Sequence, residues 1–156
     1  MLYLEDLRIG QRFVTATHTV DESQIRAFAA QFDPQPFHLD AEAAKRSIFG
    51  RLVASGWHTA AITMRLLVEG GAPLAGGLVG LGGELSWPNP TLPGDVLHVE
   101  SEIVAIVPSR SKPDRGIVTF RNETRNQRNE IVQTFSPKIV VPRRILSSRA
   151  SETRQR

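Results

Sequence analysis

A single predicted helix, over residues 57–69, restricts the folds open to this chain of 156 residues. Its apolar side chains occupy two faces, one with Trp57, Ala60, Ala61, Met64 and Val68, and the other with Ile62 and Leu66. Apart from His58, its charged or titratable residues are Arg65 and Glu69. A helix that is apolar nearly all round is expected to be buried, so the rest of the chain has to cover it.

The segments that follow this helix have the pattern of strands. Apolar and polar residues alternate over 95–107, 116–124 and 131–141, and the connections between them are short, which predicts antiparallel pairing. Upstream, we expect a strand over 11–20, a helix from a cap at Asp21 to a point before Pro34, and a short helix from Asp40 to about Ser47. The order predicts an α+β fold, with a curved antiparallel sheet wrapped around a long central helix.

Composition and charge indicate one compact domain over residues 1–142. The chain lacks cysteine, which excludes disulfides, thiolate metal sites and a cysteine nucleophile. Residues 143–156 carry a net charge of +4 and the remainder −1, so the basic character belongs mainly to the end of the chain. We expect that segment to be a disordered tail, and we expect no nucleic-acid partner because no binding motif accompanies it.

The expected surroundings of the protein follow from the same pattern. No apolar run approaches the length of a membrane-spanning helix, and the first residues do not resemble a signal peptide, so we expect a cytoplasmic protein without membrane contact. A sheet of this size covers one side of the central helix well. We therefore expect a homodimer or a dimer of dimers.

The most chemically suggestive segment is residues 31–38. It places the carboxyl group of Asp33 five positions before the imidazole of His38, with Pro34 and Pro36 between them. Proline fixes its own φ and favours an extended conformation in the residue before it, so we predict a rigid loop that is neither helix nor strand. Such a loop can hold an acid and a base near one substrate. The alternative is an Asp that caps a turn beside a packed His.

Ser55 and Gly56 stand at the predicted start of the central helix. A helix N-terminus offers free N–H groups and partial positive charge, and glycine lets a ligand approach the backbone closely. This end can therefore stabilise a carbonyl oxygen that gains negative charge. The alternative is an ordinary serine cap with a glycine placed for packing.

These segments together closely resemble the MaoC-like dehydratases, the (R)-specific enoyl-CoA hydratases and their relatives, which have the hot-dog fold. The resemblance extends over most of residues 10–142 and is carried by Phe28-Ala29-Ala30, Asp33, Pro36, His38-Leu39-Asp40, Ala43-Ala44, Phe49-Gly50, Val53-Ala54-Ser55-Gly56, Trp87-Pro88 and Pro93-Gly94-Asp95. It implies reversible addition of water to a 2-enoyl-CoA thioester. In that reaction Asp33 and His38 would hold and activate water, and the N–H of Gly56, with Ser55 beside it, would polarise the thioester carbonyl.

The chain departs from the family pattern at three positions. Gln35 stands where many members have Asn, Ser55 stands where many have His, and Pro34 directly follows the acid. The amide of Gln35 is expected to make a similar contact in the turn. These departures leave the substrate open, while both residues of the acid–base pair are present.

Substrate binding is expected from a basic segment and one aromatic residue. Arg110, Lys112 and Arg115 lie in a segment of net positive charge and are candidates for the phosphates of CoA or of a carrier protein, although a solvated loop is the alternative. Trp57 is a candidate for the pocket wall. We expect no metal and no separate cofactor, since CoA is part of the substrate.

Two other functions remain open at the level of the sequence. Other hot-dog enzymes are acyl-CoA thioesterases, which share the helix-end site but lack the spacing of Asp33 and His38. A non-catalytic acyl-CoA-binding or partner subunit is the third possibility. Release of free CoA would indicate the thioesterase, and binding without turnover would indicate the third function.

Overall fold

The computed structural model describes residues 1–145, and a six-stranded antiparallel sheet forms its centre. The elements in chain order are η1 (Leu4–Asp6), β1 (Arg12–Val14), β2 (His18–Thr19), α1 (Glu22–Phe32), α2 (Pro36–Leu39), α3 (Ala41–Ala44), α4 (Gly56–Gly70), β3 (Val79–Ser86), β4 (Val96–Pro108), β5 (Arg115–Arg125) and β6 (Ile131–Pro142). The strand order is β1-β4-β5-β6-β3, and β2 also pairs with β4. The three long strands predicted from the sequence are confirmed.

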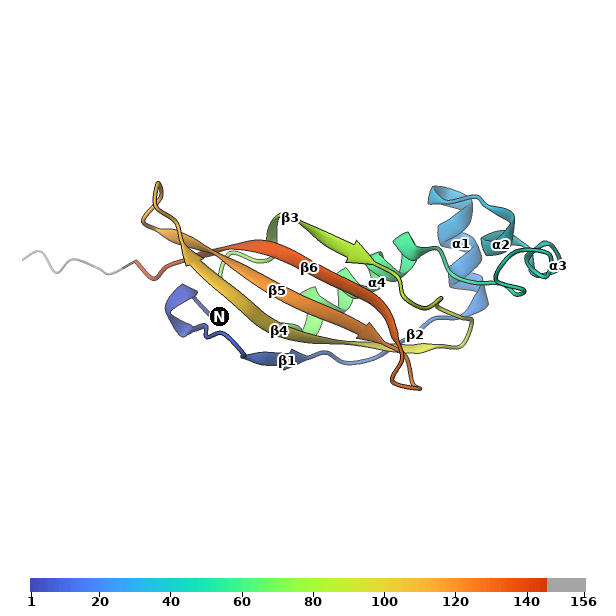
Figure 1. Cartoon of the computed structure of the whole chain (residues 1–156), viewed down its shortest axis with the longest axis horizontal. Coiled ribbons are helices and arrows are strands. Elements are labelled where there is room, and N and C mark those ends of the chain that lie inside the picture. Colours follow the sequence, from blue (N-terminus) through green and yellow to red (C-terminus); the bar gives the residue numbers. More distant parts are fainter. Residues whose placement is uncertain (146–156) are drawn as a thin grey trace, which may run out of the picture.

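Helix α4 lies behind the sheet, and α1, α2 and α3 gather at one end of the molecule (Figure 1). The inner face of the sheet and one face of α4 enclose the core, in which Ile62, Leu66 and Leu67 meet Leu97, Val99 and Val132. Alternating side chains of β4 and β5 point to this core, as expected for strands with one buried face. The predicted hot-dog arrangement is confirmed.

The prediction that the central helix is buried on nearly all sides is wrong for the single chain. Trp57 is 59% exposed and Val68 is 68% exposed. Both belong to the predicted apolar face that also includes Ala60, Ala61 and Met64. The buried stripe consists instead of His58, Thr59, Ile62, Thr63, Leu66 and Leu67. The sheet covers one face of α4, so an apolar face of the helix remains at the surface.

The predicted strand over residues 11–20 is interrupted. It is divided into β1 and β2 because, at Thr15, the side-chain hydroxyl takes the place of the backbone carbonyl as acceptor of one hydrogen bond between the strands. The hydroxyl of Thr15 accepts a hydrogen bond from the N–H of Val99 at 2.9 Å, while the N–H of Thr15 donates to the carbonyl of Val99 at 3.0 Å. The chain then rejoins β4 at His18, opposite Leu97.

The segment around His38 also differs from its prediction as a loop without helix. Residues Pro36–Leu39 form the short helix α2, with Pro36 at its first position. Proline suits that position because its φ is already helical and its missing N–H would have no partner there. Gln35 before it is extended, as expected for a residue that precedes proline. Asp33 and Pro34 remain outside helices, between α1 and α2.

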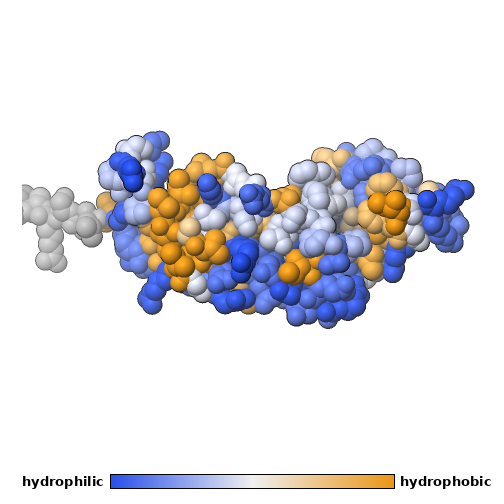
Figure 2. All heavy atoms as spheres, in the orientation of Figure 1, coloured by the Kyte–Doolittle hydropathy of each residue, from blue (hydrophilic) through white to orange (hydrophobic). Residues whose placement is uncertain are grey.

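The face of the sheet turned away from α4 has two parts. Figure 2 shows residues of low to intermediate hydropathy over its middle and a hydrophobic area nearer the end that lies farther from α1. Ion pairs such as Arg121 with Glu102 and Arg125 with Glu100 account for charge on this face. Among residues 1–145, no helix is long and apolar enough to cross a membrane.

The first residues of the predicted C-terminal tail contact the N-terminal segment. Arg144 forms an ion pair with Asp6 at 2.6 Å, and its guanidinium lies 5.1 Å from the ring centre of Tyr3. The rest of the predicted tail, residues 146–156, lies outside the described residues.

Candidate functional site

Asp33 lies directly after α1, where its carboxylate is held by two side chains. Its backbone N–H still donates to Ala29, which closes the helix. Its Oδ1 accepts a hydrogen bond from the Gln35 amide at 2.7 Å, and its Oδ2 accepts one from the Ser55 hydroxyl at 2.7 Å. The Gln35 amide thus makes a contact within the turn. The carboxylate is thus fixed from both sides.

His38 faces the same carboxylate from α2 and is buried, with 5% of its surface exposed. Its Nδ1 lies 2.7 Å from the carbonyl oxygen of Val53, which can only accept, so Nδ1 carries the proton. In the neutral ring Nε2 is then an acceptor. It lies 3.3 Å from Asp33 Oδ2, a second acceptor. Two acceptors so close require a shared proton or a donor placed between them.

The contacts of Asp33 also set its protonation. Burial alone would raise the pKa of this carboxyl group, but the hydrogen bonds from Ser55 and Gln35 and the nearby imidazole of His38 outweigh burial. The net effect is that the pKa of Asp33 is lowered from its ordinary value. Asp33 is therefore a carboxylate at neutral pH and can act as an acceptor.

The start of α4 reaches the same place. Ser55 caps the helix by accepting a hydrogen bond from the N–H of Trp57 at 3.2 Å, while its hydroxyl proton goes to Asp33. Gly56 is the first residue of the helix, so its N–H has no acceptor within the helix. A Cβ at this position would lie 2.6 Å from the indole of Trp87, which packs directly on the glycine.

These groups line one cavity of about 880 Å³. Its walls include Asp33, Gln35, Phe37, His38, Arg46, Phe49, Gly56, Trp57, Thr59, Trp87, Asn89 and Thr91. The structure thus brings together four groups predicted from the sequence: Asp33, His38, Gly56 and Trp57. Ser55 reaches the cavity through its bond to Asp33 and is itself fully buried.

Some cavity residues were not identified from the sequence. Arg46, the basic residue of the wall, is one of them. Trp87, which is among the residues that carry the family resemblance, forms an edge contact with Trp57 at 5.2 Å between ring centres. The indole N–H of Trp87 donates to Gln133 at 2.9 Å, which holds the ring over Gly56. One feature of the sequence could have indicated Arg46, namely that this residue lies just after the short helix that follows His38.

The predicted basic segment lies elsewhere in the protomer. Arg110 and Lys112 belong to the connection between β4 and β5, and Arg115 is the first residue of β5, at the opposite end of the molecule from α1 and α2 (Figure 1). Arg115 is occupied by an ion pair with Asp114 at 2.9 Å. The structure does not bring these three residues to the cavity that contains Asp33.

Residues 1–145 contain no group of three or more His, Cys, Asp or Glu side chains placed to hold a metal ion. The arrangement consists of a carboxylate, an imidazole and a helix N-terminus around one cavity. It can hold a small donor molecule between the first two and a carbonyl oxygen at the third.

Comparison with known proteins gives a consistent result. The family model described as "MaoC like domain" matches residues 6–126. The crystal structure of a MaoC-like dehydratase from Rhodospirillum rubrum superposes with a TM-score of 0.92 at 63% sequence identity, over 94% of this chain and all of that chain.

Two more distant proteins have described activities. The 3-hydroxybutyryl-CoA dehydratase of Methylorubrum extorquens is 31% identical over 114 residues, which is 72% of this chain and 70% of that protein. The (R)-hydratase PhaJ1 of Pseudomonas aeruginosa has a TM-score of 0.72 at 27% identity, over 91% of this chain and 86% of that chain.

Proposed function

Because this chain belongs to the MaoC-like domain family, which includes hydratases and dehydratases, we propose that it is a hydro-lyase acting on acyl-CoA thioesters. The proposed reaction is the reversible hydration of a 2-enoyl-CoA to a 3-hydroxyacyl-CoA. A cytoplasmic location stays a prediction.

One observation carries the proposal, the 3.3 Å approach of His38 Nε2 to Asp33 Oδ2. Both atoms are acceptors when the imidazole is neutral, so a water molecule that donates one hydrogen to each would satisfy them together. A water held in this way has its oxygen lone pairs free for attack. The lowered pKa of Asp33 keeps the carboxylate charged, so it can accept a hydrogen bond from this water.

The start of α4 supplies the second element of the proposed reaction. We assign the N–H of Gly56 to the thioester carbonyl oxygen, which gains negative charge when water adds to the double bond. A backbone donor in such a position contributes about 2.7–4 kcal/mol to transition-state stabilisation. Ser55 serves this site by joining the helix cap to Asp33, because its hydroxyl contacts both.

The proposed step balances as follows. The water oxygen forms a bond to C3 of the enoyl group, and the electrons of the double bond move toward C2 and the carbonyl oxygen. The water loses one proton to the pair formed by Asp33 and His38. A proton from this pair is then delivered to C2, which regenerates the carbonyl and leaves the enzyme unchanged.

For the phosphates of CoA we propose Arg46, since it lines the cavity. Trp57 supplies an apolar part of the wall of the same cavity. Arg110, Lys112 and Arg115 can contribute only if a second copy of the chain brings the connection between β4 and β5, with the start of β5, to this cavity.

We propose a homodimer, or a dimer of such dimers, formed through β3 and α4. Strand β3 pairs with β6 along one edge, and its exposed side chains include Val79 and Leu81. The exposed apolar face of α4 is adjacent to it, because Met64 and glycines of β3 line one cavity. A second copy would cover both features, which are otherwise open to water.

The proposal is tested with purified protein and a panel of enoyl-CoA thioesters that begins with crotonyl-CoA. Hydration should remove the ultraviolet absorbance of the conjugated enoyl group without releasing free CoA. Release of CoA would identify a thioesterase instead. Tight binding of acyl-CoA without turnover, unaffected by Asp33→Asn, would identify a non-catalytic subunit.

A further inference from the structure

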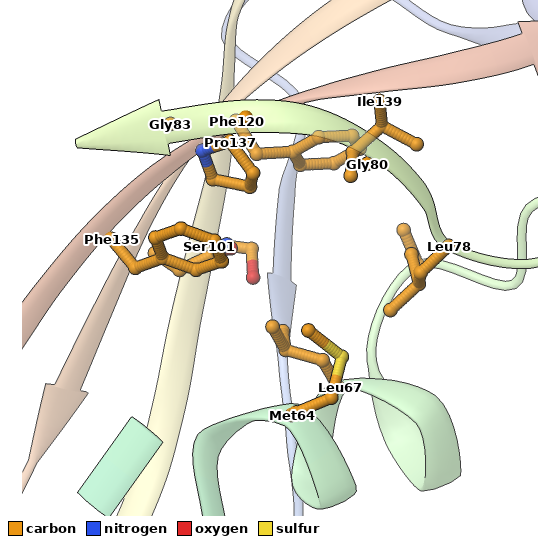
Figure 3. Close-up of a pocket in the computed structure, with 13 residues that line it drawn as sticks. Met64, Leu67, Leu78, Gly80, Gly83, Ser101, Phe120, Phe135, Pro137 and Ile139 are labelled. Carbon is orange, nitrogen blue, oxygen red and sulfur yellow. The ribbon is translucent and has the colours of Figure 1, made fainter. Parts of the chain in front are cut away.

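Strand β6 carries a buried amide on the side of the sheet that faces α4. Figure 3 shows Phe135, Pro137 and Ile139 of this strand around a mainly apolar cavity of about 250 Å³ between the sheet and α4. Gln133 precedes Phe135 by two positions and pairs with the buried Thr124, so it lies on the same face of the sheet. It is 1% exposed, at a position where the alternation of the strand calls for an apolar residue.

The partner of this amide is Trp87, which follows β3. The indole N–H of Trp87 donates a hydrogen bond to Gln133 Oε1 at 2.9 Å. An indole nitrogen can only donate, so it needs an acceptor that an apolar side chain in place of Gln133 would not supply. A buried amide is itself unfavourable unless it is hydrogen-bonded. The bond to Trp87 therefore accounts for a glutamine at this buried position.

The ring of Trp87 needs this anchor because packing alone does not fix it. Trp87 is 40% exposed. The backbone beside it is tied to β6, since the Asn89 amide donates to the carbonyl of Ile131 at 2.9 Å. That bond leaves the indole a choice of rotamers. The orientation of the ring therefore depends on its hydrogen bond to Gln133 and on its edge contact with Trp57.

The anchored ring occupies the space that a side chain on Gly56 would take. A Cβ on Gly56 would lie 2.6–2.8 Å from Cε2, Cδ2 and Cζ2 of Trp87, three atoms of the six-membered ring. The ring therefore covers the Cα of Gly56, one bond away from the N–H at the start of α4. Both residues line the cavity that contains Asp33. On this side of Gly56 the indole takes the place of water.

We infer that Gln133 is a positioning residue for the carbonyl site, because it holds Trp87 over Gly56 and the ring keeps water away from the Gly56 N–H. The inference rests on the proposed function, which assigns this N–H to the thioester oxygen. A backbone donor stabilises developing charge most strongly where water is excluded. If the indole turns away, water can accept a hydrogen bond from the N–H and compete with the thioester oxygen.

The first arm of the test measures polarisation of a bound carbonyl without any reaction. Butyryl-CoA lacks the double bond, so it cannot be hydrated, and ¹³C at its carbonyl isolates one C=O stretch in an infrared difference spectrum. A hydrogen bond to the oxygen weakens the C=O bond, so the band should lie at lower frequency on the saturated, unaltered protein than in solution. In Gln133→Met, which keeps a long side chain but has only a weak acceptor, the band should move back toward its position in solution.

The second arm measures turnover of crotonyl-CoA. In Gln133→Met, kcat should fall by about tenfold while KM changes by less than about twofold, because the lost interaction acts mainly in the transition state. Trp87→Phe removes the indole N–H at a partly exposed position, so it breaks the same bond and should shift the band and kcat in the same direction. Adding Gln133→Met to Trp87→Phe should then cause little further loss.

Thr124→Val is the matched control for the loss of a buried hydrogen bond. Thr124 is the cross-strand partner of Gln133, and its hydroxyl is bonded to that of Thr63 at 2.6 Å, away from Trp87. This variant should keep both the band position and kcat. The same losses in Thr124→Val would assign the effect to general loosening of the sheet and overturn the inference.

The remaining outcomes separate this inference from the proposed function. An unmoved band in Gln133→Met, or a full further loss of kcat when it is added to Trp87→Phe, overturns the positioning role alone. If Gln133→Met does not fold, Trp87→Phe decides the question through the same band. A shifted band without turnover of any thioester contradicts the proposed hydration and supports the positioning role. A band that stays at its solution frequency with the unaltered protein contradicts the carbonyl site, and the inference with it.

Discussion

Ser55 donates a hydrogen bond from its hydroxyl to Asp33 Oδ2 at 2.7 Å, and it accepts one from the N–H of Trp57. One side chain thereby connects the carboxylate after α1 to the N-terminus of α4, although the two residues are 22 positions apart. The proposed water-activating pair and the proposed carbonyl site are held together by this contact. A change at Ser55 should therefore alter the chemistry of Asp33 without removing a reacting group.

Replacing Ser55 with alanine should raise the pKa of Asp33, because one of the hydrogen bonds that lower it is lost. Activity on the acid side of the pH profile requires the carboxylate, so the acid limb of kcat/KM should move to higher pH. We also expect kcat to fall by about tenfold or more. Ser55→Thr keeps the hydroxyl and should restore the original limb. An acid limb that does not move in Ser55→Ala would exclude this positioning role.

Removing either member of the acid–base pair should abolish most of the activity. Asp33→Asn and His38→Gln should each lower kcat by about 10²–10⁴-fold, the range typical of general acid–base groups. Circular dichroism and thermal unfolding check that the variants remain folded. Glu22→Gln, at the exposed start of α1, serves as the control and should retain full activity. Retention of activity in Asp33→Asn would remove Asp33 from the mechanism.

Gly56→Ala should destabilise the protein as well as impair the site. The added methyl group would lie 2.6 Å from the indole of Trp87, so the ring or the start of α4 has to move. Overpacking of this kind costs about 1–3 kcal/mol in the free energy of unfolding, which urea titration measures. Trp87→Leu removes the ring and should recover part of that loss in the double variant. Equal losses with and without Trp87 would show that the clash is not the cause.

His58 should make stability depend on pH below neutrality. Burial, and to a lesser extent the charge of His18, lowers the pKa of His58 to about 4, from an ordinary value of 6.5. Between these two values the unfolded chain binds the proton and the folded chain does not, so the free energy of unfolding falls as pH decreases from about 6.5 to about 4. The loss is at most about 3 kcal/mol.

His58→Phe tests this dependence, since His58 stacks on Phe28 at 4.7 Å between ring centres and an aromatic ring preserves that contact. Urea unfolding at pH 7.5 and pH 5 should show a smaller difference in the variant than in the unaltered protein. The lowered pKa of Asp33 affects stability mainly at pH values below 3.8, the ordinary pKa of this group. That range lies below the pH range in which His58 lowers the stability. The same pH difference in both proteins would assign the effect to other groups.

The proposed dimer can be disrupted at the exposed edge of the sheet. Leu81 of β3 is 60% exposed in the single chain, and Leu81→Lys would bury a charge if a second copy covers it. Light scattering after size-exclusion chromatography should show a shift from dimer to monomer. Val107→Lys, at a 57% exposed position of β4, is the matched control and should remain dimeric. A dimer unaffected by Leu81→Lys would place the interface elsewhere.

Local patterns in the sequence predicted most of the fold and the core of the candidate site. Strand alternation gave β4, β5 and β6, and the spacing of Asp33, His38 and Gly56 indicated which groups to examine. Predictions from local sequence patterns failed where a contact between residues distant in the chain decided the structure. The hydroxyl of Thr15 interrupts a strand through its bond to Val99, and only the placement of the sheet decides which apolar face of α4 is buried.

The sequence by itself determined the elements, their antiparallel pairing and the identity of an acid, a base and a helix start, because these depend on residues near one another in the chain. Only the tertiary structure decided what these residues contact. It joined Ser55 to Asp33, placed Trp87 on Gly56, and set Arg110, Lys112 and Arg115 at the far end of the protomer. It also paired the indole of Trp87 with Gln133. Such contacts join residues distant in the chain, and they depend on how the sheet curves around α4.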